Sequence, residues 1–128
     1  MNKEMINNGS TLAARVLISI MFIMAGYNKI GGFEGTQGYM ESMGVPGWLL
    51  PVVIGVELIC GIAVLVGYQT KIAAFLLAGF TFLTAVIFHS DFSQQMQMAL
   101  FMKNLAITGA FLLLFVHGPG QWALNSEN

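Results

Sequence analysis

The chain has 128 residues, of which 56% are hydrophobic and only 9% are charged, whereas soluble domains carry about 25% charged residues. So few charged side chains cannot cover the surface of a water-soluble protein of this length. The composition therefore excludes an ordinary soluble domain and indicates a membrane protein. The formal net charge of −1, without a cluster of Lys and Arg, argues against nucleic acid as a partner.

Four apolar segments follow one another, each close to the length that crosses a bilayer. Backbone polar groups cannot be left unsatisfied in hydrocarbon, so each segment is expected to be a helix, and short connections make neighbouring helices antiparallel. The sequence therefore predicts an all-α integral membrane protein, a four-helix antiparallel bundle. We expect one domain over residues 1–128, with spans at about 11–30, 48–67, 71–89 and 98–117.

The first predicted helix carries polar and small side chains every three or four residues, so that they share one face. We expect this face to point into the bundle. Its two cations lie near the helix ends, where long side chains can instead extend to the lipid headgroups, and both readings stay open. The stripe consists of Arg15, Ser19, Phe22, Gly26 and Lys29.

The connection between the first two spans is the only long one, and its residues favour a short helix. Thr36 can cap the start of that helix, Gly44 suits the left-handed position after its end, and Pro46 prevents its continuation. With an apolar underside, the short helix is expected to lie in the headgroup layer and partly cover the bundle.

Glu57 is the most informative residue of the second span, because residues 48–67 hold no other charge. A carboxylate near the midplane costs several kcal/mol unless it is neutralised, paired or hydrated. From the rise per residue, Arg15 and Lys103 each lie within about 6–10 Å of it along the membrane normal. We predict that Glu57 is ion-paired with Arg15, Lys103 or both. It can also be a neutral acid with one hydrogen bond, and any pair can be structural or line a functional cavity.

The third and fourth spans add a seam and three polar residues. His89 ends the third span, where it is either a hydrogen-bonded helix terminus or a proton-transfer group. Lys103 and Asn104 lie inside the fourth span. A seam of small residues on the third helix allows a close approach of backbones. Its members are Ala74, Ala78, Thr81 and Ala85.

The chain carries no motif for metal, haem or nucleotide binding: HExxH, CxxCH, GxGxxG and the P-loop pattern are missing. Cys60 is the single cysteine, which excludes an intrachain disulfide and a CxxC redox pair, and it is expected to be a packing residue. We therefore predict no metal site and no covalent cofactor. Any electrons must come from a bound molecule or a partner protein.

Five blocks together resemble the DoxX family of small four-helix bacterial inner-membrane proteins. They are ARVLISIMFIMAGYNKIGGF, TQGYMESMGVPG, GVELICG, GYQTKIAAFLLAGFTFLTAVIFH and FMKNLAITGAFLLL, and the resemblance as a whole extends from about Leu12 to Gly120. The family pattern includes the charged residues Arg15, Lys29, Glu57 and Lys103 and the amide Asn104.

The resemblance implies a multi-pass protein of a bacterial inner (plasma) membrane. Its relatives are linked to thiosulfate:quinone oxidoreduction, to complexes with a sulfurtransferase and superoxide dismutase, and to defence against quinones and catechols. Distant eukaryotic relatives are cargo receptors or assembly chaperones. An even number of spans puts both termini on one side, and the distribution of Lys and Arg favours the cytoplasm for that side.

These observations lead to a first hypothesis, a membrane subunit of a quinone-linked or redox-stress-related oxidoreductase with a buried charged site. Its expected cofactor is a bound quinone, and its expected partners are the bilayer, a quinone or other aromatic small molecule, and a partner protein or a second copy. The alternatives are a non-catalytic scaffold or chaperone and a small-molecule transporter. The hypothesis assigns catalysis to Glu57, Lys103 and His89, and substrate binding to Arg15, Lys29 and Asn104.

Overall fold

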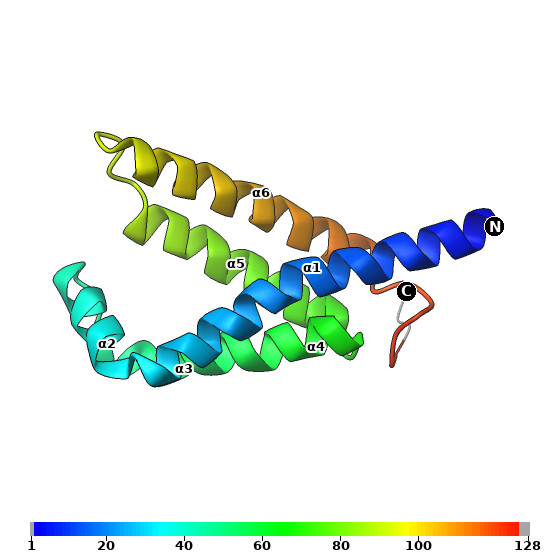
Figure 1. The fold of residues 1–128 in the computed structure, drawn as a ribbon, viewed down its shortest axis with the longest axis horizontal. Helices are drawn as coiled ribbons and strands as arrows, with labels where there is room; N and C mark the ends of the chain where they lie inside the picture. Colours follow the sequence, from blue (N-terminus) through cyan, green and yellow to red (C-terminus); the bar gives the residue numbers. More distant parts are fainter. Residues whose placement is uncertain (1, 126–128) are drawn as a thin grey trace.

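A computed structural model of the chain describes residues 2–125, and within that range all the regular secondary structure is helical. Four stretches are long and apolar enough to cross a membrane, which confirms the predicted four-helix fold class (Figure 1). The first span is α1 (Lys3–Gly31), and a short helix α2 (Phe33–Ser42) follows it. The second span is built from η1 (Gly47–Leu49), α3 (Leu50–Gly55), η2 (Val56–Cys60) and α4 (Gly61–Val66), and the last two are α5 (Thr70–Phe88) and α6 (Gln95–His117).

The first helix begins earlier than hydropathy indicates. The predicted span begins at about residue 11, whereas the helix itself begins at Lys3, where the side chain of Asn2 caps it by accepting a hydrogen bond of 2.8 Å from the Met5 backbone N–H. The predicted inward stripe is confirmed. Its buried members are Arg15, Ser19, Phe22 and Gly26.

The predicted short helix between the first two spans is α2. It begins at Phe33, and the prediction that Thr36 caps it is wrong, since the Thr36 N–H already donates to the carbonyl of Gly32. After its end, Gly44 has the expected left-handed conformation, with φ of 82°. The helix lies across one end of the bundle (Figure 1).

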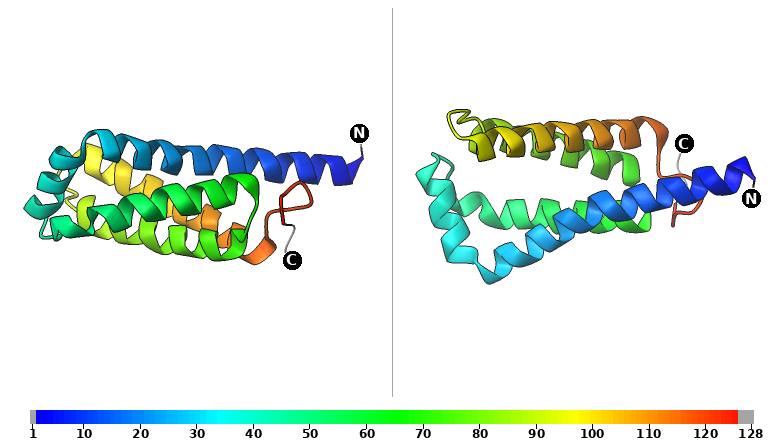
Figure 2. Two further views of the ribbon diagram at one scale, coloured as in Figure 1. Left: turned by 90° about the horizontal axis from the view of Figure 1, so that it is seen from below. Right: turned by 45° about the horizontal axis from the view of Figure 1, so that its top comes forward.

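The spans form two pairs. Helix α5 packs most extensively on α6, while α1 packs on the second span, and the two pairs meet through η2, α4 and α5 (Figures 1 and 2). Both chain ends lie at the end of the bundle opposite α2 (Figure 1). The side of the membrane on which they lie stays a prediction.

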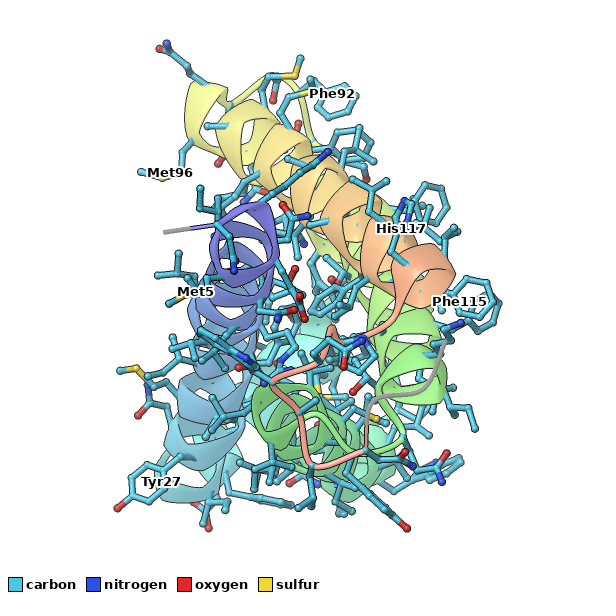
Figure 3. All side chains as sticks on the ribbon, turned by 90° about the vertical axis from the view of Figure 1, so that its right-hand side faces the viewer. Met5, Tyr27, Phe92, Met96, Phe115 and His117 are labelled. Carbon is cyan, nitrogen blue, oxygen red and sulfur yellow. The ribbon has the colours of Figure 1, made fainter. Side chains whose placement is uncertain are left out.

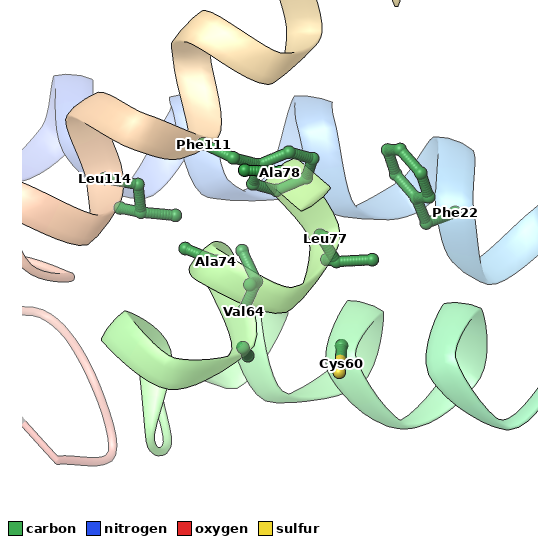
Figure 4. Close-up of a cluster of buried hydrophobic side chains, with 9 residues drawn as sticks. Phe22, Cys60, Val64, Ala74, Leu77, Ala78, Phe111 and Leu114 are labelled. Atoms are coloured by element: carbon green, nitrogen blue, oxygen red, sulfur yellow. The ribbon is translucent and has the colours of Figure 1, made fainter. Parts of the chain in front are cut away.

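The core lies where the two pairs meet. Phe22, Leu77 and Phe111 gather there, together with the small face of α5 (Figure 4). The predicted seam is confirmed, because all four of its members are buried. Outside the core, large apolar side chains such as Tyr27 and Phe115 point away from the bundle (Figure 3). Outward apolar side chains are suited to lipid.

Gly26 is where α1 comes closest to the second span. A methyl group on Gly26 would lie 2.8 Å from Leu58 Cγ and 3.3 Å from Glu57 Cβ. The two helices could keep this approach only by distorting those side chains. Gly61, on the opposite helix, makes a similar contact with Ile23. Two glycines thus set the distance between α1 and the turn that carries Glu57.

We expect Gly26→Ala to lower the free energy of unfolding by about 1–3 kcal/mol, because the added methyl group overpacks this contact. Unfolding in mixed micelles measures the change. The matched control is Gly109→Ala, since nothing lies within 4 Å of a methyl group added there. The control should stabilise α6 by about 0.5–1 kcal/mol. Equal stabilisation by both substitutions would contradict the close approach of α1 to the second span at Gly26.

Candidate functional site

The buried carboxylate of Glu57 is ion-paired with Lys29. The Nζ atom of Lys29 lies 2.9 Å from Oε1 of Glu57, and the two side chains are 28% and 4% exposed. The predicted buried ion pair therefore exists, but the predicted partners, Arg15 and Lys103, are wrong. The reason is the contact at Gly26, which lies beside Glu57. Lys29 follows Gly26 by one helical turn, about 4.5 Å, on the same face of α1.

Glu57 lies in η2, a π-helical turn between two α-helical segments. Its wider i→i+5 hydrogen bonding accommodates an additional residue, and such turns are frequent at functional sites. Val56–Cys60 is flanked by Gly55 and Gly61. The irregular turn thus coincides with the only acidic residue of the second span.

Arg15 lies about 21 Å along α1 from Lys29, too far to reach Glu57. It is 1% exposed. Its Nη1 donates to the carbonyls of Pro119, at 2.8 Å, and Trp122, at 3.0 Å, and its Nη2 donates to Leu65 at 3.3 Å. Arg15 therefore joins the C-terminal segment, residues 118–125, to the end of α4. It does not line the cavity described next.

A cavity of about 500 Å³ opens beside the ion pair, between α1, the second span, α5 and α6. Lys29 and Glu57 form part of one wall, and Lys103 and Asn104 form part of another. Aromatic and aliphatic side chains, including Phe22 and Phe80, cover most of the remainder. The space is therefore largely apolar with a few charged groups, as is typical of sites for small molecules.

The wall formed by α5 and α6 holds a small polar network. Asn104 Nδ2 donates to Thr84 Oγ1 at 3.2 Å, and the Thr84 hydroxyl donates to the Thr81 carbonyl at 2.9 Å. The Thr81 hydroxyl is buried and has no hydrogen-bond partner within residues 2–125. Lys103 forms no ion pair with the part of the chain that the structure describes. This wall can therefore donate hydrogen bonds and positive charge to a bound molecule.

The rim of the cavity carries His89 and the covering helix α2. His89 Nδ1 forms a hydrogen bond of 3.1 Å with the side-chain oxygen of Gln97, which fixes the orientation of the imidazole ring. Tyr39 of α2 stacks on Phe88 with ring centroids 5.5 Å apart. This contact holds α2 over the cavity mouth, as predicted for a covering helix.

The structure thus brings five of the six predicted site residues to one cavity and places Arg15 elsewhere. The five are Lys29, Glu57, His89, Lys103 and Asn104. Thr81 and Thr84 were not predicted as site residues. Their spacing of three in an apolar helix, at the depth of Asn104, is the signal that could have identified them. Among residues 2–125, no three His, Cys, Asp or Glu side chains gather to hold a metal.

These features define a four-helix membrane protein with a charged internal cavity. The DoxX family model matches residues 10–90. The inner membrane protein YqjF of Escherichia coli is 52% identical over 89% of this chain and 88% of that protein. The inner membrane protein YphA of the same organism is 38% identical over 89% and 86% of the two chains.

The chain therefore belongs to the DoxX family, as its resemblance predicted, and like these relatives it is a multi-pass inner-membrane protein. A third relative, from Bacillus subtilis, is named "Putative oxidoreductase CatD". It is 38% identical over 60% of this chain and 57% of that protein. No solved structure matches the chain.

Proposed function

We propose that the protein binds a quinone, or a closely related aromatic small molecule, in the charged cavity and serves as the membrane subunit of a redox-stress-related oxidoreductase. The observation that carries the proposal is the cavity itself. Its volume of about 500 Å³ falls within the range of small-molecule sites. Apolar walls suit a ring, and the charged groups of the cavity, Lys29, Glu57 and Lys103, suit the oxygens of that ring.

The charged groups have complementary roles in this proposal. A quinone oxygen gains negative charge on reduction, and Lys103 and the Thr81 hydroxyl are the donors that stabilise it. Reduction of a quinone to its quinol takes up two electrons and two protons; Glu57, held by Lys29, passes the two protons to the ring oxygens in turn, and His89 resupplies protons from the rim of the cavity. The electrons come from a partner protein or a second bound molecule. The printed name of the Bacillus subtilis relative is consistent with this chemistry.

The test is to purify the protein in lipid nanodiscs and to identify co-purifying quinone by mass spectrometry. The wild-type protein is expected to retain quinone, and Glu57→Gln is expected to lose most of it, because the proton-exchanging carboxylate is removed. Glu34→Gln is the matched control, since Glu34 is exposed on α2 and does not line the cavity. A wild-type protein that is empty, and that binds no more added benzoquinone than Glu57→Gln, would refute the proposal.

A non-catalytic scaffold is the second candidate, favoured by the ion pair between Lys29 and Glu57. In a scaffold, the sole role of that pair would be to fix α1 against the second span. In this case the double substitution of Lys29→Met with Glu57→Gln removes the pair but leaves quinone content at the wild-type level, and a stable partner protein is recovered with both forms. Loss of quinone from the double variant favours the redox subunit.

A further inference from the structure

A second cavity, of about 440 Å³, lies between α1 and α6 toward the end of the bundle that holds the chain termini. On α1 its wall runs from Ser10 to Ile18, and on α6 it runs from Ala110 to His117. Most of this wall is apolar. The backbones of α1 and α6 approach each other closely at few of the described residues, which leaves room for the cavity between them.

The two cavities occupy consecutive turns of the same two helices. On α1, the second cavity reaches Ile18 and the first begins at Met21. On α6, the first ends at Ile107 and the second begins at Ala110. Each step is three residues, about one helical turn. The lining residues of both helices recur every three or four positions, so the two cavities lie end to end along the same seam between α1 and α6.

Two aromatic rings close the inner side of this seam. Phe22 and Phe111 meet edge to face, with ring centroids 5.3 Å apart, and both belong to the buried core (Figure 4). At the junction, the first cavity is lined by a flexible methionine, Met21, which is 37% exposed, and the second by a small residue, Ala110. A shift of the Met21 side chain would let a slender hydrocarbon chain pass from one cavity to the other beside the two rings.

We infer that the groove between α1 and α6 holds the hydrocarbon tail of the ligand whose ring occupies the charged cavity. The inference rests on the proposed function and narrows the substrate class to quinones that carry a long isoprenoid or alkyl chain. From Met21 to Ser10 the groove is about 16 Å long. With the charged cavity included, it extends from Lys29 to Ser10, about 28 Å, close to the thickness of the hydrocarbon core.

The second cavity suits a tail better than a separate anionic headgroup. Arg15 is its only formally charged lining residue, and both Nη atoms of Arg15 already donate to backbone carbonyls. Its Nε atom is buried and is not presented to the groove surface. The wall offered to a ligand consists mainly of groups such as Ala14, Leu113 and Leu114.

The experiment uses a benzoquinone whose alkyl chain ends in a photoreactive diazirine, added to the full-length protein in nanodiscs. After illumination, labelled peptides are mapped by mass spectrometry. Labels are expected in residues 10–18 and 110–117, and an excess of the same ring without a chain should remove most of them. Binding of that ring-only compound is measured in parallel by displacement of the photolabel and by direct titration.

Matched substitutions test the groove. Ala14→Phe and Ala110→Phe fill it and should each abolish most of the tail labelling. Ala13→Phe and Ala106→Phe add the same ring to neighbouring positions that line neither cavity, and labelling should persist. Ring-only binding by the filled variants demonstrates that they are folded.

The outcomes separate the two proposals. If the ring-only compound binds but the labels scatter over the lipid-facing side of α5, or resist competition, the tail groove is wrong and the charged cavity stands. Equal labelling of Ala14→Phe and Ala13→Phe also overturns the groove. If the ring-only compound does not bind the wild-type protein at all, the proposed function is wrong, and the inference that the groove holds a tail is wrong as well.

Discussion

Arg15→Ala is expected to cause a large loss of stability, at least about 3 kcal/mol of unfolding free energy. Each hydrogen bond from a charged donor contributes about 1.5–3 kcal/mol, and Arg15 donates to Pro119, Trp122 and Leu65. The substitution removes all three bonds and leaves the buried carbonyl of Pro119 without this donor. Unfolding in mixed micelles measures the loss, and limited proteolysis should show faster cleavage within residues 118–125.

Two controls accompany this prediction. Arg15→Lys keeps the charge, but a single ammonium group lacks the fork that reaches carbonyls on two segments, so only part of the stability should return. Lys3→Ala removes an exposed cation from the start of the same helix and should change stability by less than about 0.5 kcal/mol. If Arg15→Ala leaves the C-terminal segment as protected as in the wild type, Arg15 does not hold that segment.

Lys29→Met is expected to have the second large effect, because it leaves the Glu57 carboxylate buried without a counter-ion. Removing one partner of a buried pair costs about 3–5 kcal/mol, and the Glu57 side chain is only 4% exposed. Glu57→Gln should cost less. The Lys29 side chain is 28% exposed, so that it can extend to the headgroup layer once its partner is neutral.

The double variant completes the comparison. Lys29→Met combined with Glu57→Gln removes both charges, so its stability should lie well above that of Lys29→Met alone. The coupling energy from the four proteins is expected to be about 1–3 kcal/mol, measured by unfolding in the same micelles. Strictly additive losses would mean that Lys29 and Glu57 do not interact, and the site would then lack its fixed charge pair.

Much of the fold could be predicted from patterns within single segments of the sequence. Span length, the small-residue face of α5 and the stripe on α1 depend only on composition and on the helical period, and packing against other helices does not change them. The covering helix α2 followed from turn residues, and Gly44 adopted its expected conformation. The start at Thr36 failed because Gly32 opens the helix one turn earlier, through a backbone hydrogen bond that any residue can make.

The details of the site depended on packing between helices, which a single helix cannot reveal. The depth estimate paired Glu57 with Arg15 because it treated the spans as rods of equal length. In fact α1 extends from Lys3, and the glycine contact sets its register against the second span. Two of the three acceptors of Arg15, the carbonyls of Pro119 and Trp122, lie beyond α6, in a segment whose glycines and proline indicated only the end of a span. The π-helical turn could not be predicted, because it is too short to change the spacing of apolar residues detectably.

That turn has a consequence for how the chain tolerates changes in length. A π-helical turn takes up one residue more than an α-helical turn while the flanking segments continue along the same axis. Deleting one residue within Val56–Cys60 would therefore leave the helices on either side, α3 and α4, facing as before. Elsewhere in the second span, a deletion would turn one half against the other by about 100°. The span thus has one position at which its length can vary without rotating the remainder, and the acidic residue occupies that turn.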